Sequence, residues 1–217
     1  RDLHSFPTRR SSDLTAGIIP IDVKKSSIDM LAFPGHKSLL GPQGTGGLYI
    51  SPNLDIEPLK EGGTGSLSES YYQPNFLPDR YESGTLNTPG IAGLGAGVEF
   101  LLKHEDMYVL NKIRKLETYF LDGLSNIDEV KVYGPTDIEH RIGVIALNIC
   151  HRDSAEVVSL LSDVYNISTR GELHCAPLAH ATIGTSEFGA VRFSPGLFSS
   201  LEDIDACIDA LSKIARQ

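Results

Sequence analysis

Short apolar runs of strand length alternate along this chain with longer stretches of helical periodicity, and this alternation limits the fold more than any other feature. Between residues 105 and 124 an apolar side chain recurs every three or four positions, which predicts a helix with one apolar face. Those side chains are Val109, Ile113, Leu116, Phe120 and Leu124. The alternation predicts an α/β fold with a boundary between two parts near residue 105.

The remaining elements are predicted from the same patterns. Strands are expected at 29–33, 47–50, 130–133, 142–149 and near Arg192, and further helices at 89–102, 154–165 and 201–215. The two strands of the first part consist mostly of apolar residues, so we predict that they are buried. Asp153 and Glu156 form a capping-box pattern at the start of the third helix. Many Gly, Ser, Pro and Asn residues between 60 and 87 predict a long irregular segment, and such segments are usually functional.

Composition excludes several classes of protein. The chain has 217 residues and a net charge of −9, which argues against a basic nucleic-acid-binding face. No apolar run reaches the ~18 residues of a membrane span, so we expect neither nucleic acid nor a membrane as partner. Three scattered cysteines do not make a disulfide framework or a zinc site, so we predict no metal and a reducing, cytoplasmic compartment. No function is assigned to His4, His104, His140, His151 and His180.

The first fourteen residues differ in character from the rest of the chain. They are polar, show no helical or strand periodicity, and lack the apolar core of a signal peptide, although their Arg and Ser content would suit a transit peptide. Residues 6–14 match the conceptual translation of a common sequencing-adapter end, which is a resemblance and not a physical inference. We therefore expect residues 1–14 to be non-native, and Thr15 onward to be the later part of a longer protein.

A lysine follows the first predicted strand, in the sequence Gly35-His36-Lys37, just before a glycine-rich loop. A lysine at such a position suits imine chemistry with a carbonyl cofactor, and an ordinary surface lysine is the alternative. The loop that follows, residues 41–47, has backbone N–H groups that would suit an anion. A plain tight turn explains the loop equally well.

A second candidate is Cys175, which adjoins His174 and lies near Arg170 in the sequence. Those neighbours favour a reactive thiol, whereas a small core residue is the alternative for an isolated cysteine. Cys207 falls on the apolar stripe of the last helix, and Cys150 follows a strand without a partner. We therefore predict that these two cysteines are structural.

Arg192 and residues 83–87 carry polar groups for which we expect a binding partner. Arg192 stands within an apolar strand, so we expect it to meet either an internal carboxylate or the carboxylate of a ligand. Residues 83–87, Ser-Gly-Thr-Leu-Asn, form a glycine turn before a helix, where a phosphate would be stabilised. A plain helix cap is the alternative at that turn.

These positions together resemble one family. Residues 29–47 are similar to the pyridoxal-phosphate lysine segment of class V aminotransferases, and most similar to the branch of cysteine desulfurases and selenocysteine-lyase-like proteins. Residues 82–87 and 170–178 recur in that branch in the same order. The resemblance extends from Thr15 to the C-terminus.

The resemblance implies a fold and a division into domains. The fold would be the C-terminal part of a pyridoxal-phosphate-dependent transferase of fold type I, like aspartate aminotransferase. Residues 15–104 would belong to the cofactor-binding large domain, which is truncated, and residues 105–217 to a small α/β domain.

The resemblance also implies functions for individual residues. Lys37 would form the covalent link to pyridoxal 5'-phosphate, with His36 on the cofactor phosphate and Thr85 reaching a phosphate across a homodimer interface. Arg192 would bind the substrate carboxylate, and Arg170 and Asn87 would assist on the substrate side. Cys175 would take sulfur from L-cysteine as a persulfide and release alanine.

The chain departs from the family pattern near its start. Gly17 fits the glycine that precedes the lysine segment, but Ser11 and Leu14 stand where the family has the aspartate and glutamine that contact the cofactor ring. Pro34 stands where many relatives have a hydroxyl residue. The resemblance therefore implies that this chain is inactive alone.

Three hypotheses for the function remain. The first is a cysteine desulfurase acting on L-cysteine or a related amino acid, as a homodimer with a sulfur-acceptor protein. The second is another class V enzyme, such as an aminotransferase or a selenocysteine lyase. The third is a non-catalytic module for dimerisation or binding.

Overall fold

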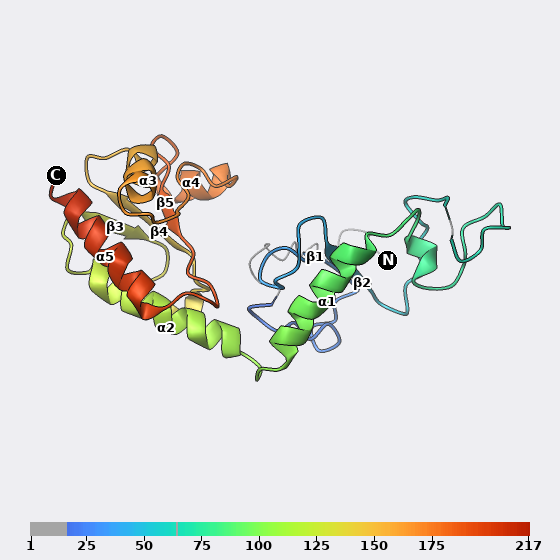
Figure 1. The fold of residues 1–217 in the computed structure, drawn as a ribbon. Coiled ribbons are helices and arrows are strands. Elements are labelled where there is room, and N and C mark those ends of the chain that lie inside the picture. The colour runs from blue at the N-terminus through green and yellow to red at the C-terminus, as the bar shows by residue number, and fades with distance from the viewer. Residues whose placement is uncertain (1–16, 64) are drawn as a thin grey trace. The chain divides into compact units, whose positions relative to one another are not determined.

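The computed structural model describes residues 17–63 and 65–217, so the expectations for residues 1–14, including Ser11 and Leu14, lie outside the described residues. The chain divides between Asp106 and Met107 into two compact units (Figure 1). The N-terminal unit and the C-terminal unit are described separately. Within the described residues, no helix combines the length and apolar character needed to cross a membrane.

The C-terminal unit contains a three-stranded antiparallel sheet in the order β3-β4-β5. The strands are β3 (Val130–Tyr133), β4 (Ile145–Ile149) and β5 (Val191–Phe193). Ile145 pairs with Phe193, and Val130 pairs with Ile149. Strand β4 begins later than residue 142 because Gly143 has φ 84°, a left-handed backbone that interrupts a strand.

Four helices belong to this unit. They are α2 (Tyr108–Leu124), α3 (Ser154–Asp163), α4 (Pro177–Ile183) and α5 (Leu201–Ala215), with a short 3₁₀ turn, η2 (Ile138–His140). Helix α2 starts at Tyr108 and not near residue 105, because Met107 has φ 68° and ends the preceding segment. Helix α4 was not expected from the sequence, since seven residues are too few to display a helical period.

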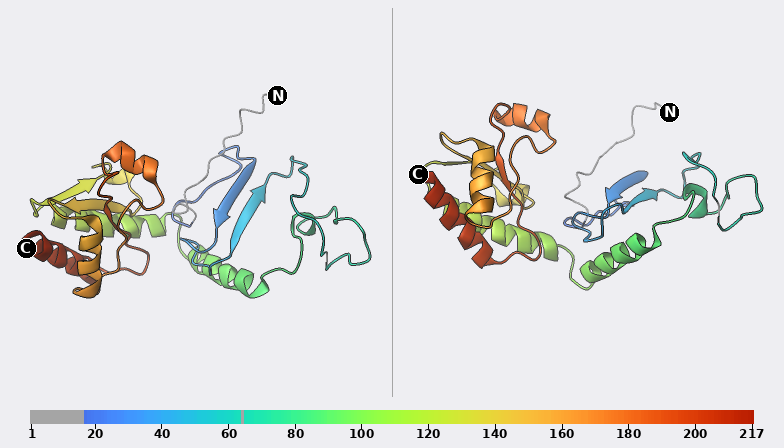
Figure 2. Two further views of the ribbon diagram at one scale, coloured as in Figure 1. Left: turned by 90° about the horizontal axis from the view of Figure 1, so that it is seen from above. Right: turned by 45° about the horizontal axis from the view of Figure 1, so that its top comes forward.

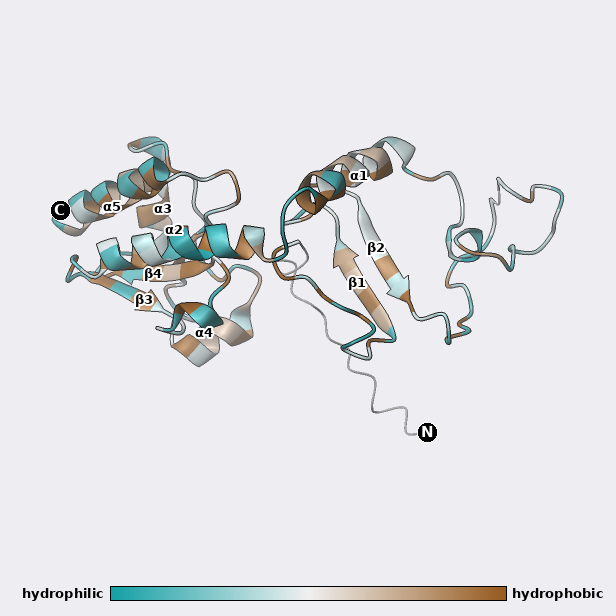
Figure 3. Ribbon diagram, turned by 90° about the horizontal axis from the view of Figure 1, so that it is seen from below, coloured by the Kyte–Doolittle hydropathy of each residue, from teal (hydrophilic) through white to brown (hydrophobic). Residues whose placement is uncertain are grey.

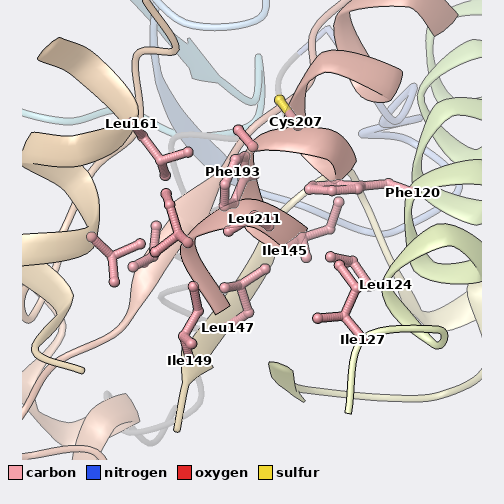
Figure 4. Packing of buried hydrophobic residues seen from close by; sticks show 14 of the residues in the cluster. Phe120, Leu124, Ile127, Ile145, Leu147, Ile149, Leu161, Phe193, Cys207 and Leu211 are labelled. Atoms are coloured by element: carbon pink, nitrogen blue, oxygen red, sulfur yellow. The ribbon is translucent and has the colours of Figure 1, made fainter. Parts of the chain in front are cut away.

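The core of this unit lies between the sheet and the helices α2, α3 and α5. All five apolar positions predicted for the helix at 105–124 are buried, which confirms that face of α2. The buried side chains of β4 alternate along the strand, and Phe120 of α2 meets Phe193 of β5 with ring centroids 5.1 Å apart (Figure 4). Leu161 of α3 and Leu211 of α5 complete the cluster.

The other face of this sheet carries Arg192. Val191 and Phe193 are buried in the core, and because side chains alternate along a strand, Arg192 lies on the opposite face, beside Ala146 of β4. Helix α4 lies on the opposite side of the sheet from α5 (Figure 2). This face is therefore where the residues between β4 and β5 can gather around the arginine.

The helix caps differ from expectation at α3 and at α5. Asp153 caps α3 by accepting a hydrogen bond from Ala155 N at 2.8 Å, but the predicted capping box is wrong because Glu156 pairs with Arg152 instead. A capping box does form at α5, between Ser200 and Asp203. It was missed because the usual pattern has Glu or Gln as its second member.

The N-terminal unit contains two antiparallel strands and one long helix. Strand β1 (Met30–Pro34) pairs with β2 (Gly46–Ile50), and η1 (Asp79–Tyr81) precedes α1 (Thr88–Leu102). The prediction that both strands are buried is wrong: Leu31 alone is buried in β1, and no residue is buried in β2. A two-stranded ribbon has no second sheet layer among the described residues to cover it.

Helix α1 is held against the turn that follows β1. A Cβ on Gly97 would lie 2.5 Å from Leu39 O, and one on Gly93 would lie 3.2 Å from Pro42, so these glycines permit close packing. In Figure 3, α1 is mostly neutral to hydrophobic along its length, whereas α2 alternates hydrophilic and hydrophobic residues. The unit thus offers apolar helix surface with little polar covering.

The segment between β2 and α1 is irregular apart from η1, which confirms the prediction for residues 60–87. Arg80 organises part of it, because its guanidinium donates to Ile56 O at 2.9 Å and pairs with Asp55 at 2.7 Å. Gln73 accepts from Gly62 N and donates to Asp79 O. Hydrogen bonds, and not apolar burial, shape this loop.

Candidate active site

Lys37 lies in the connection between β1 and β2, and the backbone holds that connection tightly. Gly35 N donates to Thr45 O and Gly41 N donates to Gly35 O, both at 2.8 Å. Gly17 approaches so closely that a Cβ there would lie 2.4 Å from Ser38 O. A Cβ on Gly35 would lie 2.4 Å from Thr45 Oγ1, and one on Gly41 would lie 2.9 Å from Gly35 O, so the turn that carries the lysine needs glycine on both sides.

The side chains of His36 and Lys37 are exposed. Among the described residues, no hydrogen bond or ion pair engages Lys37 Nζ, so the amine is available for covalent bonding to a carbonyl group. An amine held on a rigid turn next to an imidazole fits a phosphorylated aldehyde such as pyridoxal phosphate.

The turn before α1 carries the two other predicted residues of this unit. Thr85 is exposed, with its hydroxyl open to a ligand or to another chain. Asn87 is the N-cap of α1, because its Oδ1 accepts from Gly90 N at 3.1 Å. The helix-cap alternative therefore accounts for one side of the Asn87 amide.

In the C-terminal unit the structure brings three predicted residues together. Arg170 Nη2 donates to Cys175 Sγ at 3.2 Å. The backbones of Arg170 and Arg192 pair as a β-bridge at the edge of β5, with N–O distances of 3.2 and 2.7 Å. We call the cluster of Arg170, Cys175 and Arg192 the Cys175 site.

The turn that carries Cys175 has an uncommon backbone. Glu172, His174 and Cys175 have φ values of 66°, 52° and 60°, in the left-handed region that non-glycine residues avoid. Ala190 N donates to Glu172 O at 3.1 Å, and a Cβ on Gly189 would lie 2.5 Å from Glu172 Cα. Such strain persists only where surrounding contacts enforce it, and it clusters at functional sites.

Arg192 has no carboxylate partner among the described residues. Its Nε is buried without a hydrogen-bond partner. Burial, and then the charge of Arg170, lowers the pKa of Arg192 from its ordinary value. Of the two partners expected from the sequence, the internal carboxylate is therefore absent from the described chain, and a ligand carboxylate fits the open donors.

His180 is a residue of this site that the sequence analysis left without a function. It is 3% exposed, and it hydrogen-bonds to both His174 and Thr185. The signal was the recurrence of histidine six residues after His174, across the start of a helix too short to recognise.

The three cysteines lie in different environments. Cys175 and Cys150 are exposed, and Cys207 is buried in the core cluster. The structural assignment holds for Cys207 and is wrong for Cys150, which follows the end of β4 and lines a surface pocket with Lys131 and Arg152. Cys150 is exposed because side chains alternate along β4: Ile145, Leu147 and Ile149 are buried in the core, so the residue that follows faces away from it.

Burial, with a contribution from Asp203, raises the pKa of Cys207 to about 11. The folded state therefore keeps the thiol proton at pH values where the unfolded chain loses it. We expect the free energy of unfolding to fall as pH rises from 9, the ordinary value, towards 11. Urea titrations across that range should show the fall, and Cys207→Ala should remove this contribution to it; an unchanged slope in the variant would contradict the assignment.

Comparison with known proteins identifies the family. The family model described as aminotransferase class-V matches residues 14–207. The chain therefore belongs to the class V aminotransferase family, whose cysteine desulfurase members depend on pyridoxal phosphate. This confirms the family indicated by the lysine segment.

Individual relatives define the similarity further. The chain is 33% identical over 204 residues to a probable cysteine desulfurase of Methanothermobacter thermautotrophicus, covering 92% of this chain and 50% of that protein. It is 34% identical over 203 residues to a cysteine desulfurase of Escherichia coli O157:H7, covering 91% and 48%. The chain thus spans about half the length of the curated relatives it matches.

Solved structures agree on the fold. The apo cysteine desulfurase of Thermococcus onnurineus matches with a TM-score of 0.80 at 28% identity, covering 94% of this chain and 51% of that one. The cysteine desulfurase CsdA of Escherichia coli matches with a TM-score of 0.82 at 27% identity, covering 94% and 50%. The predicted fold class, part of a fold type I transferase, is confirmed.

Proposed function

We propose that the protein containing this chain is a pyridoxal-phosphate-dependent cysteine desulfurase, which converts L-cysteine to L-alanine and holds the sulfur as a persulfide on Cys175. One observation carries the proposal beyond family membership. An exposed cysteine accepts a hydrogen bond from Arg170 beside a second arginine, Arg192, that lacks a carboxylate partner among the described residues. A sulfur nucleophile next to a free carboxylate-binding group suits an amino-acid substrate that carries sulfur.

We assign residues 15–104 to the cofactor-binding large domain and residues 105–217 to the small domain. Lys37 would hold the cofactor through Nζ, His36 would contact its phosphate, and Thr85 would reach a phosphate across a homodimer interface. When bound, the cofactor supplies the electron sink that the reaction needs. Lys37 Nζ would also move the proton at the substrate α-carbon.

Arg192 would bind the substrate carboxylate through its guanidinium, assisted by Arg170. Asn87 is proposed as a further substrate-binding residue through its amide nitrogen, since Asn87 Oδ1 caps α1. Cys175 Sγ would attack the substrate sulfur, forming the S–S bond while the carbon–sulfur bond breaks. The electrons of that bond remain on the carbon, which takes up a proton and leaves as alanine. Atoms and electrons balance without a further oxidant.

The partners would be L-cysteine or a related amino acid, a second copy of the chain, and a protein that accepts the sulfur. The exposed loop around Thr85 supports a contact with another chain, and the three free thiols suit a reducing cytoplasm. Selenocysteine remains a substrate for comparison with L-cysteine.

Cys175→Ala in the intact protein should abolish alanine formation from L-cysteine, because no other group would accept the sulfur. Alanine release is measured together with the mass of the Cys175 peptide, which should gain one sulfur atom in the wild type. Cys150→Ala is the matched control, since Cys150 is also exposed and should leave the rate unchanged. Full activity in Cys175→Ala would refute the desulfurase. A wild type that forms no alanine and holds no pyridoxal phosphate on Lys37 would favour the binding module.

A further inference from the structure

A series of hydrogen bonds connects the turn that carries Cys175, the Cys175 turn, to Thr185. His174 Nε2 is 2.9 Å from Arg170 O, and His174 Nδ1 is 3.2 Å from His180 Nε2. His180 Nδ1 is 2.7 Å from Thr185 Oγ1, and Thr185 N donates to His180 O at 2.9 Å. His180 and Thr185 are 3% and 2% exposed, so this series of hydrogen bonds ends at residues that are closed to solvent.

The backbone acceptor at one end fixes the direction of every bond. A carbonyl oxygen has no hydrogen to donate, so His174 Nε2 carries the proton of its bond to Arg170 O. In a neutral imidazole Nδ1 is then an acceptor, and His180 Nε2 is the donor. His180 Nδ1 therefore accepts in turn, and the Thr185 hydroxyl donates to it.

The neutral form of His174 is the one that this site favours. Burial is the main cause that lowers the pKa of His174 below its usual range. The titratable groups that face it are Arg192, His180 and Arg170. The charges of the two arginines act in the same direction as burial, whereas the hydrogen bond to Arg170 O opposes them. A positive charge on His174 would add to two arginines, and no carboxylate among the described residues offsets it.

We propose that His180 and Thr185 are positioning residues of the Cys175 turn, and that His174 anchors this turn and does not accept the Cys175 proton. Both ring nitrogens of His174 are engaged, one by Arg170 O and one by His180. The group that contacts the sulfur is the Arg170 guanidinium.

The turn needs such an anchor because of its backbone. His174 and Cys175 are consecutive residues in the left-handed region, a conformation that L side chains disfavour. The histidine chain ties this strained pair to Thr185, just beyond the end of α4. Without these hydrogen bonds the turn can relax and displace Cys175 Sγ. A misplacement of a reacting atom by about 1 Å lowers a rate by up to roughly 100-fold.

Thr185→Val preserves the shape of the side chain and removes the hydroxyl donor. We expect persulfide formation on Cys175 to slow by roughly 10-fold or more, with an unchanged KM for L-cysteine, and Thr185→Ser to restore the rate. Thr182→Val is the matched control, because Thr182 is exposed on α4 and donates only to Leu178 O. An unchanged rate in Thr185→Val, or an equal loss in Thr182→Val, would overturn the proposal.

A second measurement needs no activity. Nitrogen-15 NMR of the histidine rings in the wild type should show His174 as the neutral tautomer protonated on Nε2 near neutral pH. Thr185→Val should disturb the His180 ring signals. A proton on His174 Nδ1, or a charged His174 near neutral pH, would refute the anchor, because either state frees the ring for a different partner.

The inference rests on the proposed function for its effect on persulfide formation, and the two fail differently. If the tautomer pattern is found but the wild type forms no persulfide, the desulfurase proposal fails and the anchor stands. If persulfide forms and the tautomer pattern is absent, the anchor alone fails.

Discussion

Glu117→Leu should lower the free energy of unfolding by about 3–5 kcal/mol, because it leaves the buried charge of Arg141 unpaired. Glu117 is 0% exposed, and its Oε1 accepts from Arg141 Nη1 at 3.1 Å. Its Oε2 accepts from Gly143 N at 2.8 Å, so the carboxylate also binds the left-handed turn before β4. Urea unfolding with a constant slope measures the loss.

Two further variants separate burial from charge. Glu117→Leu combined with Arg141→Met should recover most of the lost stability, since two apolar side chains can replace a buried ion pair. Glu139→Gln breaks the exposed pair of Arg114 and Glu139 and should cost at most about 1 kcal/mol. Equal losses in Glu117→Leu and Glu139→Gln would contradict the argument, because they would show that burial does not matter.

The C-terminal unit should fold when it is expressed alone as residues 107–217. Among the described residues, the buried apolar side chains that precede Met107 are Ile18, Leu31 and Pro74, and the hydrophobic core lies in the C-terminal unit. A domain of this size with such a core should have a free energy of unfolding of about 5 kcal/mol or more. A single cooperative urea transition, monitored by circular dichroism, is the expected result.

The matched fragment is residues 1–106, which should show no cooperative transition. Its exposed apolar side chains include Tyr71, Leu59 and Leu102, which are 101%, 97% and 79% exposed. In the part of this fragment that the structure describes, its two strands have no second sheet layer, and an isolated pair of strands is marginal in water. A cooperative transition in this fragment, or none in residues 107–217, would refute the division of stability between the two units.

Much of the fold followed from local patterns. The apolar stripe of α2 and the position of α5 were predicted because a helix that covers a core repeats its apolar residues along the chain. Helix α4 and the exposure of β1 were not predicted. Helix α4 is shorter than a recognisable period, and the burial of β1 depends on which elements pack against it. A run of apolar residues predicts a strand, but it does not predict which elements pack against the strand or how far it is buried.

The candidate site divides in the same way. The order of residues around Lys37, Cys175 and Arg192 was enough to indicate the family, because each motif is contiguous in the sequence. Whether Arg192 meets an internal carboxylate could not be decided there, since its surroundings come from segments far apart in the chain. The function of His180 was likewise hidden, because a buried histidine is recognised by its partners and not by its spacing.

The sequence by itself therefore determined the alternation of elements, the main apolar helical faces and the chemical groups of the site. The tertiary structure decided that Arg170 contacts the sulfur, that Arg192 meets no carboxylate among the described residues, and that His174 is held at both ring nitrogens. Periodicity along a chain records only which face is apolar. Hydrogen bonds and charge pairs between distant residues exist only once the backbone has brought them together.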